Sequence, residues 1–155
     1  MTNIKKIIKN FVPSFILEFY YTHKIKKKKY FGHHELDKKI YKYLNYFNGF
    51  YVELGANDGL TQSNTYFFEK NLGWNGILIE PIFNKYTQCI KNRSKSNFFY
   101  NRACVGFDFK KKKIKMIYSN LMSTIIDDEI INKLDSKKHA LSGEKYLSKN
   151  EKVNE

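Results

Sequence analysis

The stretch that decides the fold runs from Tyr51 to Pro81. It opens with Tyr51-Val52-Glu53-Leu54-Gly55-Ala56-Asn57-Asp58-Gly59 and closes with Gly76-Ile77-Leu78-Ile79-Glu80-Pro81. Both ends contain a short apolar run that is typical of a buried parallel strand, and each run carries an acid at its end. Between them lie a glycine loop and a segment with helical spacing. The stretch therefore predicts one strand–loop–helix–strand unit, which holds a nucleotide-like ligand at the carboxyl ends of its strands.

The composition indicates one folded domain. The chain has 155 residues, of which 42% are hydrophobic and 17% aromatic, and its formal net charge is +13. Lysine is spread along the whole chain, so the charge is first of all a compositional bias. A surface this basic nevertheless favours polyanions such as anionic lipid, acidic glycans or nucleic acid.

Residues 1–31 form a basic, aromatic arm. Its apolar part, 11–21, is shorter than the about 20 residues of a membrane span. It also makes a poor signal peptide, because Lys26–Lys29 stand where a cleavage site would be. A helix opened by Pro13 and Ser14 would carry Phe15 and Phe19 on one side. Two interpretations stay open: a helix on an anionic membrane surface, or a helix at the domain edge beside a solvated lysine run.

Residues 32–134 complete the predicted domain. We expect a supporting helix over 36–47 with Asp37 on its wet face, and a crossover helix over 82–93. A third strand is expected over 98–105. Alternation over 113–118 predicts an antiparallel strand at a sheet edge. A short helix is expected within 125–134, and residues 135–155 form a polar tail.

Two cysteines, Cys89 and Cys104, have the spacing of neither a disulfide framework nor a CxxC pair. We expect buried free thiols and hence a reducing, cytoplasmic location, with a peripheral position at the membrane as an extension of it. The run His33-His34-Glu35 lacks a second ligand pair, so no metal site is expected.

The glycine loop and the two acids suggest the chemistry of the site. Gly55 and Gly59 allow close approach of the backbone to a ligand, whose acidic group the loop N–H groups can face. Glu80, at the end of the second strand, can accept both hydroxyl hydrogens of a ribose. Glu53, one strand away, could take an ammonium group. This pair of acids fits a ligand with a ribose and a cationic head better than it fits a dinucleotide.

The same loop excludes two common nucleotide motifs. A GxGxxG motif would need glycine at Asn57 and Leu60, and a phosphate loop would need a lysine before Thr61. The pattern thus favours S-adenosylmethionine over NAD. An ordinary strand–helix turn with incidental acids is the structural alternative.

The residues resemble the FkbM-type methyltransferases over about residues 49 to 125. The resemblance lies in Val52–Gly59, Gln62–Tyr66, Phe68–Lys70 and Gly73–Pro81, and continues more weakly through Tyr86, Arg93 and Asn101–Ala103. It implies an α/β, Rossmann-like class I methyltransferase fold with a mostly parallel sheet flanked by helices, S-adenosyl-L-methionine as methyl donor, and a sugar or glycan hydroxyl as acceptor.

The resemblance also implies roles for single residues. The family's cofactor loop matches Glu53, Gly55, Ala56, Asn57 and Gly59, and its ribose-binding acid matches Glu80. By position, Asn101 and Ala103 would lie beside the adenine.

The chain departs from the family after Tyr118, where no Asp-x-Glu-Gly-like strand follows. Three parallel strands and a hairpin make about half of a doubly wound sheet, so we expect a fold incomplete at its C-terminal side, either truncated or completed by a second chain. No catalytic base is identified, because an aspartate such as Asp58 in a glycine loop usually binds the local backbone.

Three functions follow in order. The first is an O-methyltransferase, or its cofactor-binding half. The second is a non-catalytic cofactor-binding half-domain, tethered to a membrane or a partner by the arm. A nucleic-acid binder is disfavoured, because the aromatic residues form no recognised stacking motif.

Overall fold

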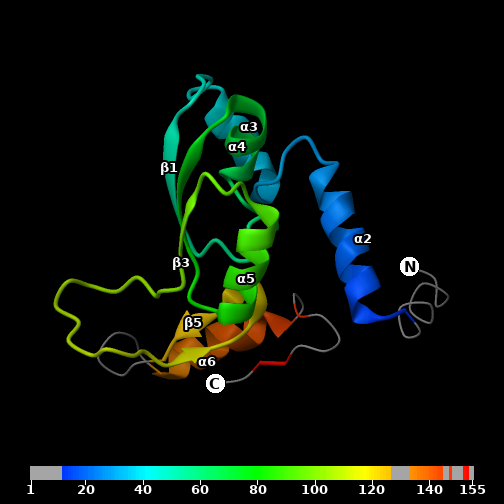
Figure 1. The fold of residues 1–155 in the computed structure, drawn as a ribbon. Coiled ribbons are helices and arrows are strands. Elements are labelled where there is room, and N and C mark those ends of the chain that lie inside the picture. The colour runs from blue at the N-terminus through cyan, green and yellow to red at the C-terminus, as the bar shows by residue number, and fades with distance from the viewer. Residues whose placement is uncertain (1–11, 127–132, 145–146, 148–151, 154–155) are drawn as a thin grey trace.

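The computed structural model describes residues 12–126, 133–144, 147 and 152–153. Figure 1 shows their arrangement. In chain order the elements are α2 Ser14–Lys26, η1 His33–Glu35, α3 Leu36–Tyr41, β1 Phe50–Leu54, α4 Tyr66–Leu72, β2 Asn75–Ile79, α5 Phe83–Asn92, β3 Phe98–Tyr100, β4 Met116–Ile117, η2 Asn120–Met122, β5 Thr124–Ile125 and α6 Lys133–Ser142.

The main sheet has three parallel strands in the order β1-β2-β3. The register places Val52 beside Ile77, and Ile77 beside Phe98. Helices α4 and α5 make the crossovers, as the sequence predicts, and Gly73 ends α4 in the left-handed conformation at φ 68°. The described chain is therefore an α/β protein whose sheet is compatible with a Rossmann-like fold.

The helices cover only one face of this sheet (Figure 1). On the covered face lie Tyr51 and Leu78, both buried. The neighbouring positions Val52 and Leu54 point to the other face and are 56% and 62% exposed. Phe50, Phe98 and Tyr100 share that open face. Parallel sheets are usually covered on both faces, so this apolar surface is unusual for the described chain alone.

The outer edge of β1 is also open among the described residues. Gly49 accepts a hydrogen bond from Asn75, and Gly55 donates one to Ile79, which orients the odd-numbered backbone groups of β1 toward β2. The N–H and C=O groups of Phe50, Val52 and Leu54 consequently face the free edge. Edge and open face together are what a half-built doubly wound sheet would present.

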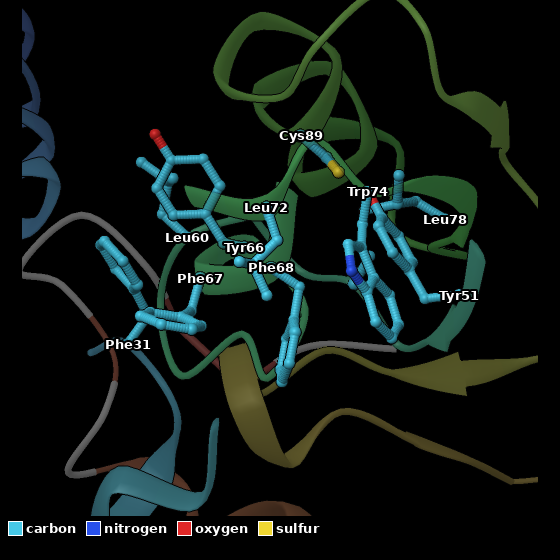
Figure 2. Close-up of a cluster of buried hydrophobic side chains, with 11 residues drawn as sticks. Phe31, Tyr51, Leu60, Tyr66, Phe67, Phe68, Leu72, Trp74, Leu78 and Cys89 are labelled. Carbon is cyan, nitrogen blue, oxygen red and sulfur yellow. The ribbon is translucent and has the colours of Figure 1, made fainter. Parts of the chain in front are cut away.

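The main core lies between the sheet and its helices (Figure 2). Phe67 packs edge-on against Phe68, and Phe68 against Trp74, whose indole N–H donates to the carbonyl of Tyr46 at 2.7 Å. The fully buried members are listed here: Phe31, Tyr51, Ala56, Leu60, Tyr66, Phe67, Phe68, Leu72, Trp74, Leu78 and Cys89. Aromatic side chains thus dominate the packing of a small domain.

A second, smaller cluster follows the sheet. Strands β4 and β5 pair antiparallel, and Ile117, Ile126 and Ala140 pack together under α6. The predicted hairpin is confirmed, but it forms a sheet of its own and does not extend the main sheet. The expected patternless tail is wrong for α6, where Ser119 Oγ donates to the carbonyl of Ala140 at 2.6 Å. Most of the helix expected within 125–134 lies outside the described residues, and Ile125 itself belongs to β5.

Two further expectations are corrected. The helix predicted over 36–47 ends at Tyr41, and Asp37 is fully buried because its carboxylate accepts the N–H of Phe31 at 2.6 Å. Tyr43 and Phe47, which were expected in the core, are exposed. The third strand ends at Tyr100, so Cys104 lies in an exposed loop. Within the described chain, no helix has the length and apolarity needed to cross a bilayer.

Candidate functional site

The glycine loop joins β1 to α4 and folds back on the end of β2. The N–H groups of Gly55 and Ala56 both donate to the carbonyl of Ile79, at 2.9 and 3.0 Å. Gly55, Asn57 and Gly59 adopt positive φ angles of 69°, 49° and 78°. Glycine adopts this conformation without cost, and asparagine tolerates it better than most residues, so this sequence suits the turn.

Glu80 lies at the centre of the site. Its Oε2 accepts the N–H of Asn57 at 2.8 Å, and its Oε1 accepts the N–H of Ile82 at 2.9 Å. The residue is 6% exposed, and burial raises the pKa of its carboxyl, while the two accepted hydrogen bonds oppose that rise. A carboxylate has about four acceptor positions, so two remain for a ligand.

Two features of the loop point toward a missing contact. Asn57 is 8% exposed, and its Nδ2 donates to Asn120 Oδ1 at 3.2 Å. Its own Oδ1 has no hydrogen-bond partner in the described part of the chain. A Cβ added at Gly55 would meet nothing within 4 Å. A buried amide oxygen without a donor is costly, so a bound donor group would stabilise the loop.

A pocket of about 550 Å³ opens where β2 and β3 end. The amide of Asn101 closes its floor by donating to the carbonyls of Glu80 and Pro81 at 2.8 and 2.9 Å. Ile82, Ala103, Ile114 and Met116 provide apolar walls, and Arg102 and Lys112 provide charge. An apolar slot beside a ribose-binding acid is suited to a nucleobase.

Glu53 occupies a different environment from the one expected. Its Oε2 accepts from Thr65 Oγ1 at 2.6 Å and from Arg93 at 3.1 Å, and both its oxygens accept from Ser63 Oγ. These contacts lie on the helix-covered side of the sheet. The carboxylate that the sequence offered to a cofactor ammonium is thus already used in holding the loop and α4.

Arg93, at the end of α5, is the residue that sequence reasoning undervalued. Its side chain has no exposed surface, and besides Glu53 it binds Glu69 at 2.8 Å and the hydroxyl of Tyr51 at 2.6 Å. Burial alone would raise the pKa of Glu69, but the charge of Arg93 lowers it below its ordinary value. Burial raises the pKa of Tyr51, so its hydroxyl keeps its proton. Helical spacing recorded Arg93 only as another position on α5.

Gly59 and Asp58 also serve the protein interior. A Cβ at Gly59 would come within 2.8 Å of Arg93 Cγ and 3.0 Å of Cys89 Sγ, so this glycine allows the loop to pack on α5. Asp58 accepts from the N–H groups of Leu60 and Thr61, at 2.9 and 2.7 Å. The expectation that Asp58 binds the local backbone is confirmed.

The structure accordingly divides the predicted site residues into two groups. Gly55, Ala56, Asn57 and Glu80 meet at the ends of β1 and β2, with Asn101 and Ala103 at the adjoining pocket. Glu53 and Gly59 belong to the Arg93 network behind them. The described residues include no group of three or more histidine, cysteine, aspartate or glutamate side chains that could hold a metal ion.

Comparisons of the chain with protein-family models, with curated proteins and with solved structures gave no match.

Proposed function

We propose that the chain is the cofactor-binding half of an S-adenosylmethionine-dependent O-methyltransferase that acts on a sugar or glycan hydroxyl. One observation carries the proposal above the others: the Glu80 carboxylate lies at the end of β2, hydrogen-bonded to the Asn57 N–H of the glycine loop, beside a pocket of about 550 Å³. Ribose, amino-acid and base subsites would then be adjacent.

The residues present fit such a ligand. Glu80 would accept the ribose hydroxyls through its two remaining acceptor positions, Asn57 Oδ1 would accept a donor such as an ammonium, and Ala103 would lie against the base. The open space at Gly55 would allow close approach of the backbone. When bound, the cofactor would supply an electrophilic methyl group on a sulfonium.

Glu53 takes a supporting role in this proposal. Through Ser63, Thr65 and Arg93 it holds the loop that carries Asn57 against the start of α4. Ser63 Oγ also accepts the N–H of Tyr66 at 3.1 Å, which caps that helix. The conserved function of the acid would be to keep the loop preorganised rather than to touch the ligand.

Calorimetric titration with S-adenosylhomocysteine tests the proposal. Wild type should bind, and Glu80→Gln should weaken binding about 10- to 100-fold, because hydrogen bonds to a charged group are lost. The amide of that variant faces one backbone N–H, so Ala103→Trp is the second arm: it fills the pocket without changing Glu80. Glu35→Gln, an exposed acid far from the loop, is the control. No binding by wild type would overturn the proposal.

The runner-up function is a non-catalytic half-domain that needs a second polypeptide. The open face of the sheet and the free edge of β1 favour it, since one side of a substrate cleft has no cover in the described chain. Binding of S-adenosylhomocysteine without methyl transfer to any sugar hydroxyl would support this alternative. Transfer by the isolated chain would exclude it.

A further inference from the structure

The basic arm contains a helix whose apolar side chains have no cover. In α2, Phe15, Ile16 and Phe19 are 69%, 44% and 74% exposed, although this is a folded helix of 13 residues. Positions 15, 16 and 19 lie on one side of an α-helix. Helices of soluble domains normally bury such a side, so the exposed one requires a partner.

The helix is held in place by its C-terminal end. Lys70 of α4 donates to the carbonyl of Lys26 at 2.7 Å, and the following residues Tyr30 and Phe31 stack on the core, at ring distances of 5.0 Å from Phe67 and 4.7 Å from Tyr66. Figure 1 shows α2 standing beside the domain, joined to it by the short segment 27–30. The exposed side chains are therefore presented from a fixed base.

The charge around the helix identifies the partner. Residues 12–30 contain five lysines, at 24 and 26–29, and a single acid, Glu18. The side chains of Lys24 and Lys27–Lys29 are exposed and lie at or beyond the C-terminal end of α2, next to the apolar half. An apolar patch with an adjoining cluster of positive charge is complementary to lipid tails below anionic headgroups.

We propose that α2 and Lys27–Lys29 form an anchor that binds the protein to the surface of an anionic bilayer. The aromatic half of α2 enters the headgroup–acyl boundary, and the lysines stay among the phosphates, as their flexible stems allow. Neither interaction alone gives firm attachment, whereas the two together do. This inference is independent of the proposed function, because α2 contributes no residue to the pocket.

Vesicle flotation of the full chain tests the anchor. The probes are vesicles of phosphatidylcholine alone and vesicles with about one third phosphatidylglycerol, at roughly 0.1 M salt. Wild type should bind only the anionic vesicles. Phe15→Ser combined with Phe19→Ser should reduce the partition coefficient at least about tenfold, because two large apolar side chains no longer insert. Lys27→Gln, Lys28→Gln and Lys29→Gln together should reduce it by about 100-fold.

Matched controls separate an anchor from the general attraction of a basic chain. Phe107→Ser removes a fully exposed phenylalanine from another lysine-rich loop. Lys110→Gln, Lys112→Gln and Lys113→Gln together remove the same charge from that loop, where these lysines are exposed. Both controls should retain most of the binding. Equal losses from control and arm variants, or no binding by wild type, would overturn the proposal. Circular dichroism checks that each variant is folded.

Discussion

The carboxylate of Glu69 accepts the Nε–H of Arg93 at 2.8 Å, which joins α4 to the end of α5 beneath the sheet. The same Oε2 also accepts from the hydroxyl of Tyr51 and from the amide of Asn97, both at 2.7 Å. A single buried cation therefore compensates carboxylates on two elements. Such a network fixes the relative position of β1, α4 and α5, and with it the two strand ends that carry the candidate site.

Loss of the cation should be far more costly than loss of an exposed one. Arg93→Met leaves Glu53 and Glu69 buried without a counter-charge, so we expect the free energy of unfolding to fall by about 3–5 kcal/mol. Urea denaturation measures it. Arg102→Met, at an exposed position, is the control and should stay within about 0.5 kcal/mol. Similar midpoints for both variants would show that the network contributes little.

The acid limb of stability should depend on Glu69. Its pKa is lower in the folded protein than in the unfolded chain, so its contribution is present above the ordinary glutamate pKa and is lost as the pH falls through the folded value. Glu69→Gln should be less stable at neutral pH and should lose less on acidification below about pH 5. Denaturation at several pH values measures this slope. Parallel curves for variant and wild type would contradict the assignment.

Local patterns predicted the elements around the site well. The apolar runs at 50–54 and 77–79 became β1 and part of β2, and the glycine after Leu72 ended α4. These signals depend on residues close in sequence. The role of Arg93 depends on two carboxylates that are 40 and 24 residues away, at Glu53 and Glu69, and no local pattern encodes that.

The same limit explains the corrections. Asp37 has the spacing of a wet helical position, yet the chain entering from Phe31 supplies an N–H that buries it. The segment after Leu134 has no clear apolar stripe, but Ala140 and Ser136 are small enough to pack closely under β4 and β5. Tertiary contacts outweighed periodicity in both places.

The two cysteines should react very differently. Cys104 is exposed, whereas Cys89 is buried and burial raises the pKa of its thiol to about 12. Because the thiolate is the reactive form, a disulfide reagent at neutral pH should modify one thiol rapidly in the native protein. Urea should release the second. Cys104→Ser should abolish the fast phase, and a remaining fast phase would show that the environment of Cys89 opens.

Two glycine variants separate packing from ligand approach. A Cβ at Gly76 would lie 2.1 Å from the carbonyl oxygen of Tyr51, so Gly76→Ala should unfold or severely destabilise the sheet. Gly55→Ala meets no neighbour but keeps a left-handed φ of 69°, which costs about 1–2 kcal/mol. It should therefore fold with a lower Tm while binding S-adenosylhomocysteine less tightly. Unchanged binding by folded Gly55→Ala would show that the ligand does not approach this backbone.

The open face of the sheet gives the last prediction. Val52 and Ile77 are register neighbours on that face, while Leu78, on the covered face, is 1% exposed. Val52→Thr keeps a β-branched side chain at an exposed strand position, so it should change the free energy of unfolding by less than about 0.5 kcal/mol. Leu78→Ala, which opens a cavity, should cost about 2–5 kcal/mol.

Both variants are compared by urea denaturation, with sedimentation velocity recording the oligomeric state. A small effect at Val52 with a monomeric chain would mean that the open face is bare in the isolated protein and available to a completing polypeptide. A large effect at Val52, together with dissociation of a dimer, would mean instead that a second copy already covers it. The sheet then would not be half of a larger one, and the half-domain interpretation would fail at its structural premise.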